Sequence, residues 1–253
     1  MKKNIFLAFF FFQICTSQNV KRKLFWEESF NGNLLNENIW NFENGDGCPN
    51  LCGWGNNENQ IYCTQNQYLK NGKLIIEATN DNGIFKSSKI TTQNKFFFQY
   101  GYIEIKAKLP LGKGLWPAFW MLGSNIKSVG WPKCGEIDIL EYVGREPNVI
   151  FTSLHTDDSH GNTINTKKTV NKSIEKGFHL YAIDWNKDKI SFFIDNNLVY
   201  TFQPENKTES NWPFNQPFYF IINLAIGGNF GGPTIHTLIF PQKFEIDYIK
   251  VFK

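Results

Sequence analysis

Strand signals dominate this sequence and constrain its fold more than any other feature. Segments rich in β-branched and aromatic residues alternate with turn residues, whereas no stretch longer than two turns carries a 3.6-residue apolar stripe. Many short strands at this spacing predict an all-β sandwich or barrel. The segments expected to form strands are residues 73–79, 100–109, 136–142, 149–155, 179–185, 189–194, 218–225 and 244–252.

The strand signals run from Leu24 to the end of the chain without a linker or charge run. We therefore expect one domain over residues 18–253. Asp195, Asn196 and Asn197 predict a tight hairpin turn between two of its strands.

The first 17 residues have the pattern of a secretory signal peptide. A basic start with Lys2 and Lys3 precedes an apolar run that ends at Ile14, and small residues follow it up to Ser17. The run is shorter than the roughly 20 residues of a membrane span. We expect residues 1–17 to direct secretion, with the periplasm or cell surface as alternative destinations. Acylation of Cys15 is a weaker alternative, because Ile14 is bulky where a small residue is expected.

Charge and aromatic content narrow the class of partner. Without Lys2 and Lys3, 24 basic residues face 23 acidic ones. This balance gives no electrostatic case for nucleic acid or an anionic membrane, and it argues against a highly sulfated substrate. Aromatic residues make up 17% of the chain, too many for the core alone, so some are expected to line a binding surface. We expect a monomer.

Four cysteines follow the predicted leader: Cys48, Cys52, Cys63 and Cys134. An even number in an exported protein predicts disulfides and few free thiols. Three pairings are open, and the sequence does not choose among them. A metal site is the weaker interpretation, because no paired His or Cys motif follows Cys48 and Cys52.

Three carboxylates stand within one apolar strand segment. Glu136 and Asp138 are two residues apart and share a face, while Ile137 and Ile139 point into the core. Glu141 has the wrong parity, and a β-bulge near Leu140 would bring it to the same face. Two carboxyls about 5–5.5 Å apart are the equipment of a retaining glycosidase. The alternative is an exposed edge strand with solvated acids.

At these residues the chain resembles glycoside hydrolase family 16, and within it the laminarinase-like endo-β-1,3-glucanases. The resemblance covers nearly the whole of residues 18–253. It implies a β-jelly-roll sandwich of the concanavalin A-like type with a concave substrate cleft. The motifs that carry it are residues 53–58 (GWGNNE), 114–122 (GLWPAFWML), 136–141 (EIDILE), 217–228 (PFYFIINLAIGG) and 246–252 (IDYIKVF), together with His155.

The resemblance implies a role for each carboxylate. Glu136 is the expected nucleophile, and Glu141 is the expected general acid/base. Asp138, between them, tunes both by charge and hydrogen bonding. His155 matches a position beside the acid/base, although a satisfied buried imidazole is an equally good interpretation. No cofactor is required for this chemistry.

Several residues are candidates for sugar binding, because the C–H face of a sugar ring packs on an indole. Trp is also a common core residue, and Trp26, Trp40, Trp185 and Trp212 are expected to be structural. Asn223 either binds sugar or holds a loop. The residues expected to bind substrate are Trp116, Trp120, Trp131, His155, Asn56, Glu58, Trp54 and Asn223.

Two departures from the family pattern bear on binding. Lys89 stands where many relatives carry Arg, and its ammonium group cannot donate the paired, bidentate hydrogen bonds of a guanidinium. Some members hold a structural Ca²⁺ far from the cleft, which implies a calcium site near Asp247 and the segment from Glu27 to Phe30. Ser29 removes part of that ligand set, since Ca²⁺ needs several oxygen ligands.

Two other functions compete with β-1,3-glucan hydrolysis. Related folds without the acids serve as lectin-like glucan-recognition proteins, but Glu136, Asp138 and Glu141 are all present here. The same chemistry could also act on mixed-linkage β-1,3-1,4-glucan, agar or carrageenan. The near-neutral charge favours a neutral glucan.

Overall fold

The computed structural model describes residues 22–253. The predicted signal peptide over residues 1–17 lies outside this range. In the described part of the chain, no helix is long and apolar enough to cross a membrane.

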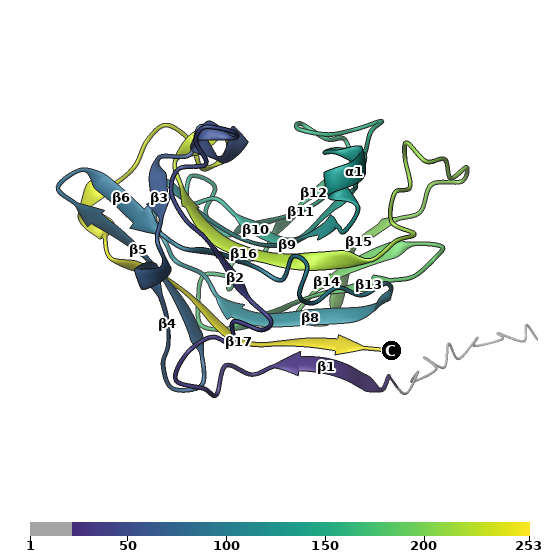
Figure 1. The fold of residues 1–253 in the computed structure, drawn as a ribbon, viewed down its shortest axis with the longest axis horizontal. Coiled ribbons are helices and arrows are strands. Elements are labelled where there is room, and N and C mark those ends of the chain that lie inside the picture. The colour runs from purple at the N-terminus through teal and green to yellow at the C-terminus, as the bar shows by residue number, and fades with distance from the viewer. Residues whose placement is uncertain (1–21) are drawn as a thin grey trace, which may run out of the picture.

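Two sheets stack face to face, as predicted for a sandwich, and their strands pair antiparallel except for β3 and β6, which run parallel (Figure 1). The seven-stranded sheet has the order β12 (Thr166–Val170), β11 (Val149–His155), β10 (Glu136–Tyr142), β9 (Leu115–Gly123), β16 (Phe218–Ile226), β7 (Lys89–Thr91) and β2 (Asn41–Glu43). The ten-stranded sheet has the order β15 (Asn197–Phe202), β14 (Ile190–Ile194), β13 (His179–Trp185), β8 (Gly101–Lys108), β17 (Gln242–Phe252), β5 (Leu74–Asp81), β6 (Ile84–Ser87) and β3 (Gln60–Tyr62), with β1 (Leu24–Glu28) on β17 and β4 (Gln67–Leu69) on β5.

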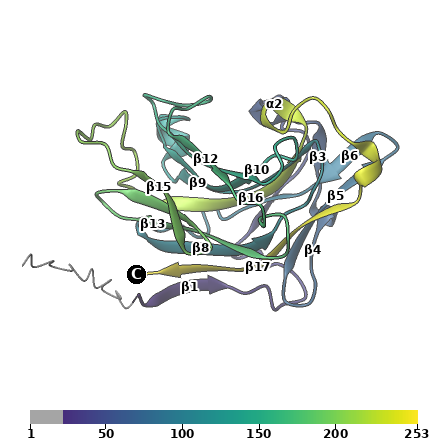
Figure 2. The ribbon, with the colours of Figure 1, turned by 180° about the vertical axis from the view of Figure 1, so that it is seen from behind.

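Within residues 22–253, helices are confined to single turns. They are α1 (Ile126–Val129), α2 (Gly228–Gly231) and the 3₁₀ turns η1 (Cys52–Gly55), η2 (Thr64–Asn66) and η3 (Thr237–Ile239). The seven-stranded sheet is curved, and α1 rises above one end of its concave face (Figure 1). At the other end α2 rises above the same face (Figure 2).

The expected strands agree closely with the observed ones. The ranges of β10, β11 and β13 match residue for residue, and the other five differ by one or two residues at an end. Asp195 and Asn196 have φ of 49° and 64°, the left-handed pair that a tight hairpin turn requires. The expected ranges do not include β1, β12, the strands of three or four residues, or β9, whose Trp and Pro residues obscure its alternation.

Aromatic side chains join the two sheets. Trp185 from β13 meets Phe218 from β16 edge-on, with ring centroids 5.3 Å apart, and both side chains are almost fully buried. Trp40 and Trp212 are also buried, and the partly buried Trp26 packs against the same core. Full burial of one such side chain contributes about 1.5–3 kcal/mol. These four indoles are structural, as predicted.

The cysteines form one disulfide, between Cys48 and Cys52, and leave Cys63 and Cys134 free. The expectation of few free thiols is therefore wrong for these two residues. Their surroundings differ: Cys134 lies in a small apolar cluster with Leu122, whereas Cys63 is only partly buried. The sequence could not show that these two cysteines lie in different surroundings.

The carboxylates behind the calcium expectation are already engaged. Asp247 Oδ2 lies 2.9 Å from Lys106 Nζ. Both oxygens of Glu28 accept hydrogen bonds, one from the Phe30 amide and one from Trp40 Nε1. This arrangement does not fit a Ca²⁺ site, which needs several uncommitted oxygen ligands.

Thiol titration should distinguish the two free cysteines. In a chain that starts at residue 18, we expect two reactive thiols in denaturant but only one fast-reacting thiol in the folded protein. Burial raises the pKa of Cys134 to about 12, and a thiol reacts through its thiolate. Cys63→Ser should abolish the fast phase, whereas Cys134→Ser should leave it intact. Four thiols in denaturant would contradict the Cys48–Cys52 bridge.

Candidate active site

A β-bulge in β10 places three carboxylates on the concave face. The register against β11 pairs Asp138 with Ser153 and Glu141 with Phe151, so one extra residue is inserted between them. Ile139 and Leu140 are consecutive, yet both belong to the buried core. The extra residue reverses the alternation of side chains beyond it, so that Glu141 points to the same face as Glu136 and Asp138, as the sequence predicted.

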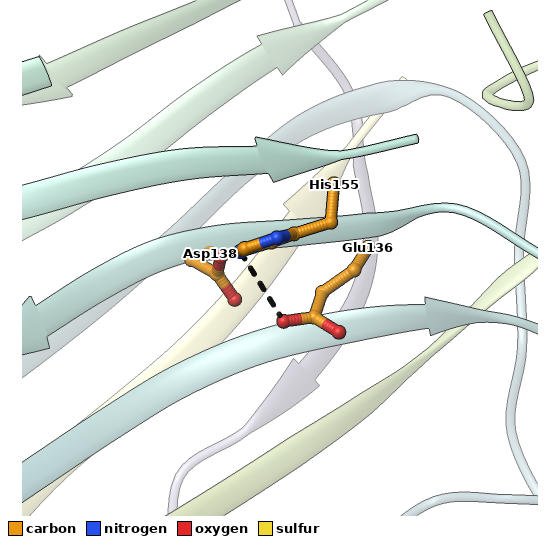
Figure 3. A group of neighbouring side chains, drawn as sticks. All are labelled: Glu136, Asp138 and His155. Carbon is orange, nitrogen blue, oxygen red and sulfur yellow. Dashed lines mark ion pairs between the residues drawn. The ribbon is translucent and has the colours of Figure 1, made fainter. Parts of the chain in front are cut away.

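Glu136, Asp138 and His155 form a close group at the start of β10 (Figure 3). His155 lies opposite Glu136 in the β10–β11 register. Its Nε2 is 3.1 Å from Asp138 Oδ2 and 3.7 Å from Glu136 Oε1. The family resemblance placed His155 beside the acid/base. These contacts join it to Glu136 and to Asp138, the middle residue of the carboxylate strip formed by Glu136, Asp138 and Glu141. The Asp138 side chain is 4% exposed.

Glu141 is held from the neighbouring strand. Trp116 on β9 donates a hydrogen bond from Nε1 to Glu141 Oε1 at 3.0 Å. The Trp116 indole meets Phe230 of α2 edge-on, with ring centroids 5.3 Å apart. Glu141 is 8% exposed, so a single N–H group orients an almost buried carboxyl. Phe230 is a neighbour that sequence reasoning missed.

Burial shifts the carboxyl pKa values upward. It raises the pKa of Glu136 to about 8, assisted by the charge of Asp138 and opposed by His155 and the Trp131 hydrogen bond. Burial also raises the pKa of Asp138, to about 7, and that of Glu141 well above its usual range, with the charge of Asp138 adding to the effect. Near neutral pH the strip therefore carries fewer than three negative charges.

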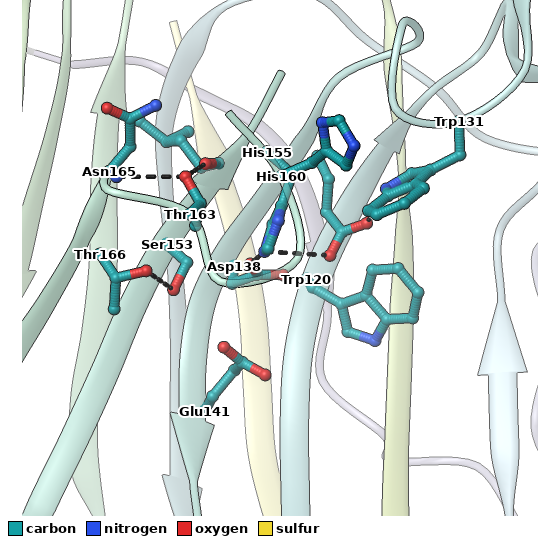
Figure 4. Close-up of polar contacts among 12 residues, drawn as sticks. Trp120, Trp131, Asp138, Glu141, Ser153, His155, His160, Thr163, Asn165 and Thr166 are labelled. Atoms are coloured by element: carbon teal, nitrogen blue, oxygen red, sulfur yellow. Dashed lines mark hydrogen bonds and ion pairs between the residues drawn. The ribbon is translucent and has the colours of Figure 1, made fainter. Parts of the chain in front are cut away.

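Trp131 covers Glu136 from the α1 side. Its Nε1 donates a hydrogen bond to Glu136 Oε2 at 2.8 Å, while the indole itself is 47% exposed. His160, from the β11–β12 loop, meets this indole edge-on at 5.4 Å (Figure 4). That loop is anchored by Thr163 Oγ1, which donates to the Leu154 carbonyl at 2.9 Å. An exposed indole that also orients a carboxylate suits a sugar platform.

A chain of hydrogen bonds connects Trp120 on β9 to Glu58, which precedes β3. Trp120 Nε1 donates to Asn223 Oδ1 at 2.8 Å, and Asn223 Nδ2 donates to the Tyr62 hydroxyl at 3.0 Å. That hydroxyl donates to Glu58 Oε2 at 3.0 Å. Asn56 Nδ2 reaches the other oxygen, Glu58 Oε1, at 3.3 Å. Four predicted binding residues therefore belong to one connected network.

Tyr62 and Gln60 are members of this network that sequence reasoning missed. Gln60 Nε2 donates to Glu58 Oε2 at 2.6 Å, and Tyr62 is 1% exposed. The signal was present in the sequence, because Glu58, Gln60 and Tyr62 alternate with the period of a strand. Since three donors occupy Glu58, its carboxylate orients neighbouring side chains as well as facing the binding surface.

Lys89 lies directly opposite Asn223 in the β7–β16 register. Its Nζ is 4.2 Å from the ring centroid of Trp54 and 5.6 Å from that of Trp120. Burial lowers the pKa of Lys89, opposed chiefly by the charge of Glu58. Trp54 donates from Nε1 to the Gly45 carbonyl at 3.2 Å, so its ring is fixed. The Lys89 ammonium therefore lies near two indoles and places a cation on this side of the site, although it cannot form the two parallel hydrogen bonds of an Arg.

All eleven predicted site residues belong to this concave face or its walls. The catalytic candidates and His155 come from β10 and β11, and the remaining members come from β9, β16, η1 and the loops around them. The arrangement offers buried carboxyls of raised pKa beside indoles that are exposed, as Trp131 is, or partly buried. This is the equipment for acid-assisted cleavage of a glycosidic bond.

Comparison with known proteins gives a family and relatives. The sequence profile described as "Glycosyl hydrolases family 16" matches residues 55–250. A glucan endo-1,3-beta-glucosidase A1 of Niallia circulans is 36% identical over 261 residues, which cover 91% of this chain but 38% of that protein. A beta-glucanase of Rhodothermus marinus is 34% identical, covering 91% of this chain and 85% of that protein.

Solved structures agree with these relatives. A laminarinase from Flavobacterium sp. UMI-01 superposes with a TM-score of 0.90 at 68% identity, covering 91% of this chain and all of that one (100%). The laminarinase catalytic domain of Thermotoga maritima gives a TM-score of 0.87 at 38% identity, covering 92% of this chain and 98% of that one. Both are jelly-roll enzymes of the predicted fold. With a matching family profile, these relatives and this fold, the chain belongs to glycosyl hydrolase family 16.

Proposed function

We propose that this protein is an endo-acting hydrolase of β-1,3-glucan that retains the anomeric configuration. The observation that carries the proposal is the bulge in β10, which puts Glu136 and Glu141 on one face of one strand. Two carboxyls about 5–5.5 Å apart favour a covalent intermediate, whereas direct attack by water needs a wider gap, and positions on one face of one strand suit the shorter spacing.

The reaction has two displacements. Glu136 attacks the anomeric carbon, the bond to the leaving oxygen breaks, and Glu141 gives that oxygen its proton. Glu141, now ionised, then takes a proton from water, and the hydroxide displaces Glu136 from the glycosyl-enzyme. The raised pKa of Glu141, caused chiefly by burial, keeps the acid protonated at the start of the cycle.

Asp138 supplies a place for the proton that Glu136 must give up. The two carboxyls are neighbours on one face of β10, and both pKa values are raised by burial. They therefore titrate as a pair. When Asp138 holds the shared proton, Glu136 is ionised and able to attack. His155, whose charge favours ionised Glu136, assists the same state.

Substrate choice rests on the relatives and on the indoles. The Niallia and Flavobacterium relatives are named for endo-1,3-beta-glucosidase and laminarinase activity. The proposed platforms for neutral sugar rings are Trp131 at one end of the carboxylate strip, Trp116 at the other, and Trp120 on the adjacent strand.

Two alternatives are supported by other relatives. A beta-1,3-glucan-binding protein of Penaeus monodon is 32% identical over 206 residues, and an endo-1,3-1,4-beta-glycanase of Rhizobium meliloti is 29% identical over 183 residues. The complete set of Glu136, Asp138 and Glu141 favours catalysis over binding alone. Comparing laminarin with lichenan as substrates separates β-1,3-glucan from mixed-linkage preference.

The compartment and assembly are also proposals. A leader over residues 1–17 would export the chain, and an extracellular site suits a polymeric substrate. We propose a monomer that acts on glucan and associates with neither nucleic acid nor membrane, since its near-neutral charge gives no electrostatic attraction to either.

Glu136→Gln and Glu141→Gln should each lower kcat on laminarin by at least about a thousandfold, because each removes a group that acts in the transition state. Asp138→Asn should lower it less. The measurement is initial rate against laminarin concentration. Near-wild-type turnover in Glu136→Gln would contradict the assignment of the nucleophile.

The same variants have a stability signature. A carboxyl whose pKa is higher in the folded than in the unfolded state makes the folded protein less stable as the pH rises. The loss begins near the unfolded-state pKa of about 4.5 and grows up to the folded-state pKa. For Glu136 that folded value is about 8. The gain in Tm of Glu136→Gln over wild type should therefore be small at pH 4 and grow up to pH 8. A merely damaged fold would lower Tm at every pH.

The stereochemistry of the product offers an independent test. NMR of the first oligosaccharide released should show the β-anomer, followed by slow mutarotation, because a covalent intermediate gives net retention. An initial α-anomer would mean inversion and would rule out Glu136 as the nucleophile.

Trp131 should have two separable roles. Trp131→Ala should lower kcat/KM for laminarin by at least about tenfold, since a stacked ring contributes about 0.5–1.5 kcal/mol beyond area burial. Trp131→Phe should keep most of the stacking but lose the N–H donor, which lowers the pKa of Glu136. The acidic limb of its pH profile should therefore move to higher pH.

The control is Trp212→Ala, which removes a buried structural indole. It should lower Tm and reduce activity on long and short laminari-oligosaccharides alike. If Trp131→Ala shows that same uniform pattern, Trp131 is structural and the platform proposal fails.

A further inference from the structure

Glu136, Asp138 and His155 bring one nitrogen and two oxygen donors to a single point. In the described part of the chain, this is the group whose potential ligand atoms all lie within 4.8 Å of one another. The three side chains converge from β10 and β11 (Figure 3). Their mixed chemistry distinguishes them from an ordinary acidic cluster.

The spacing of these atoms matches a small tetrahedral cation. Two ligands bound to Zn²⁺ at about 2.0–2.1 Å lie about 3.3–3.4 Å apart in tetrahedral geometry. His155 Nε2 is 3.1 Å from Asp138 Oδ2 and 3.7 Å from Glu136 Oε1. Adjustments of a few tenths of an ångström would make both separations equal to that edge.

One ligand atom makes no hydrogen bond within the protein, and its neighbour is His155 Nε2 at 3.1 Å. Asp138 Oδ2 is buried and accepts no hydrogen bond, and the whole residue is 3% exposed. Trp131 holds Glu136 through Oε2, so that Oε1 is the oxygen that faces His155. A buried carboxylate oxygen that faces an imidazole nitrogen without a hydrogen bond to it is satisfied by a cation placed between the two atoms.

We infer that these three residues bind a divalent transition metal of the Zn²⁺ class, and that the bound cation blocks the active site. One imidazole and two carboxylates suit Zn²⁺, Co²⁺ and Cu²⁺. Ca²⁺ and Mg²⁺ require six or more oxygen ligands, including ordered waters, and this group of one nitrogen and two oxygens does not match that requirement. His155 Nδ1 has no hydrogen-bond partner, so no second acceptor strengthens this ligand, and the site binds less tightly than one with an oriented imidazole.

Metal binding and inhibition differ in what they require. Binding depends only on the three side chains. Inhibition rests on the proposed function, because a cation that occupies the Glu136 carboxylate prevents its attack on the anomeric carbon. Zn²⁺ should therefore compete with laminari-oligosaccharides for the free protein.

The binding test is a Co²⁺ titration followed by visible absorption, in a Cys63→Ser background that removes the partly exposed thiol. We expect one saturable equivalent with tetrahedral d–d bands, displaced by Zn²⁺. His155→Gln should raise the Kd by at least about a hundredfold, as loss of a ligand exceeds typical losses of a supporting contact. His236→Gln, at an exposed histidine away from the group, should leave the Kd unchanged. Circular dichroism checks that each variant is folded.

The competition test uses the same signal. Laminari-oligosaccharide should displace Co²⁺, and Zn²⁺ should raise the apparent KM for laminarin while millimolar Mg²⁺ has no effect. No saturable spectrum, or a spectrum unchanged in His155→Gln, would overturn the metal site. Co²⁺ retained at saturating oligosaccharide would overturn the blocking. If wild type hydrolyses no glucan, the proposed function fails, but the Co²⁺ titration still decides whether the site binds metal.

Discussion

Strand parity is the constraint on which the active site depends. Side chains alternate between the two faces of a strand, so residues five apart, such as Glu136 and Glu141, would point to opposite sides. The bulge between Asp138 and Glu141 inserts one residue and cancels this mismatch. It also forces Ile139 and Leu140 together into the core. The apolar interior therefore stabilises the irregularity that the chemistry needs.

The second constraint is the burial of three acids on one strip. Desolvation and mutual repulsion raise all three pKa values, and the surrounding protein offsets this only in part. Trp131 and Trp116 each donate one N–H to an acid, and His155 supplies a partner on the adjacent strand. The result is a site that holds protons near neutral pH, as acid-assisted cleavage requires.

The indoles connect binding with catalysis. Trp131 presents an exposed face while its N–H fixes Glu136. The partly buried Trp120 is linked to Glu58 through Asn223 and Tyr62. A sugar ring stacked on either indole thus contacts a group already tied to the charged residues. Lys89 completes this wall from β7. The site is consequently a network anchored in the sheets, with loops contributing its rims.

The sequence by itself determined the all-β class, the exact extent of β10, β11 and β13, and the position of the bulge. These features depend on local alternation and turn chemistry, which are written in neighbouring residues. The tertiary structure alone decided that Cys63 and Cys134 stay unpaired, that His155 faces Asp138, and that Tyr62 reaches Asn223. Those contacts join strands distant in the chain. Their geometry follows from the sheet order and the curvature of the sandwich, which local patterns do not encode.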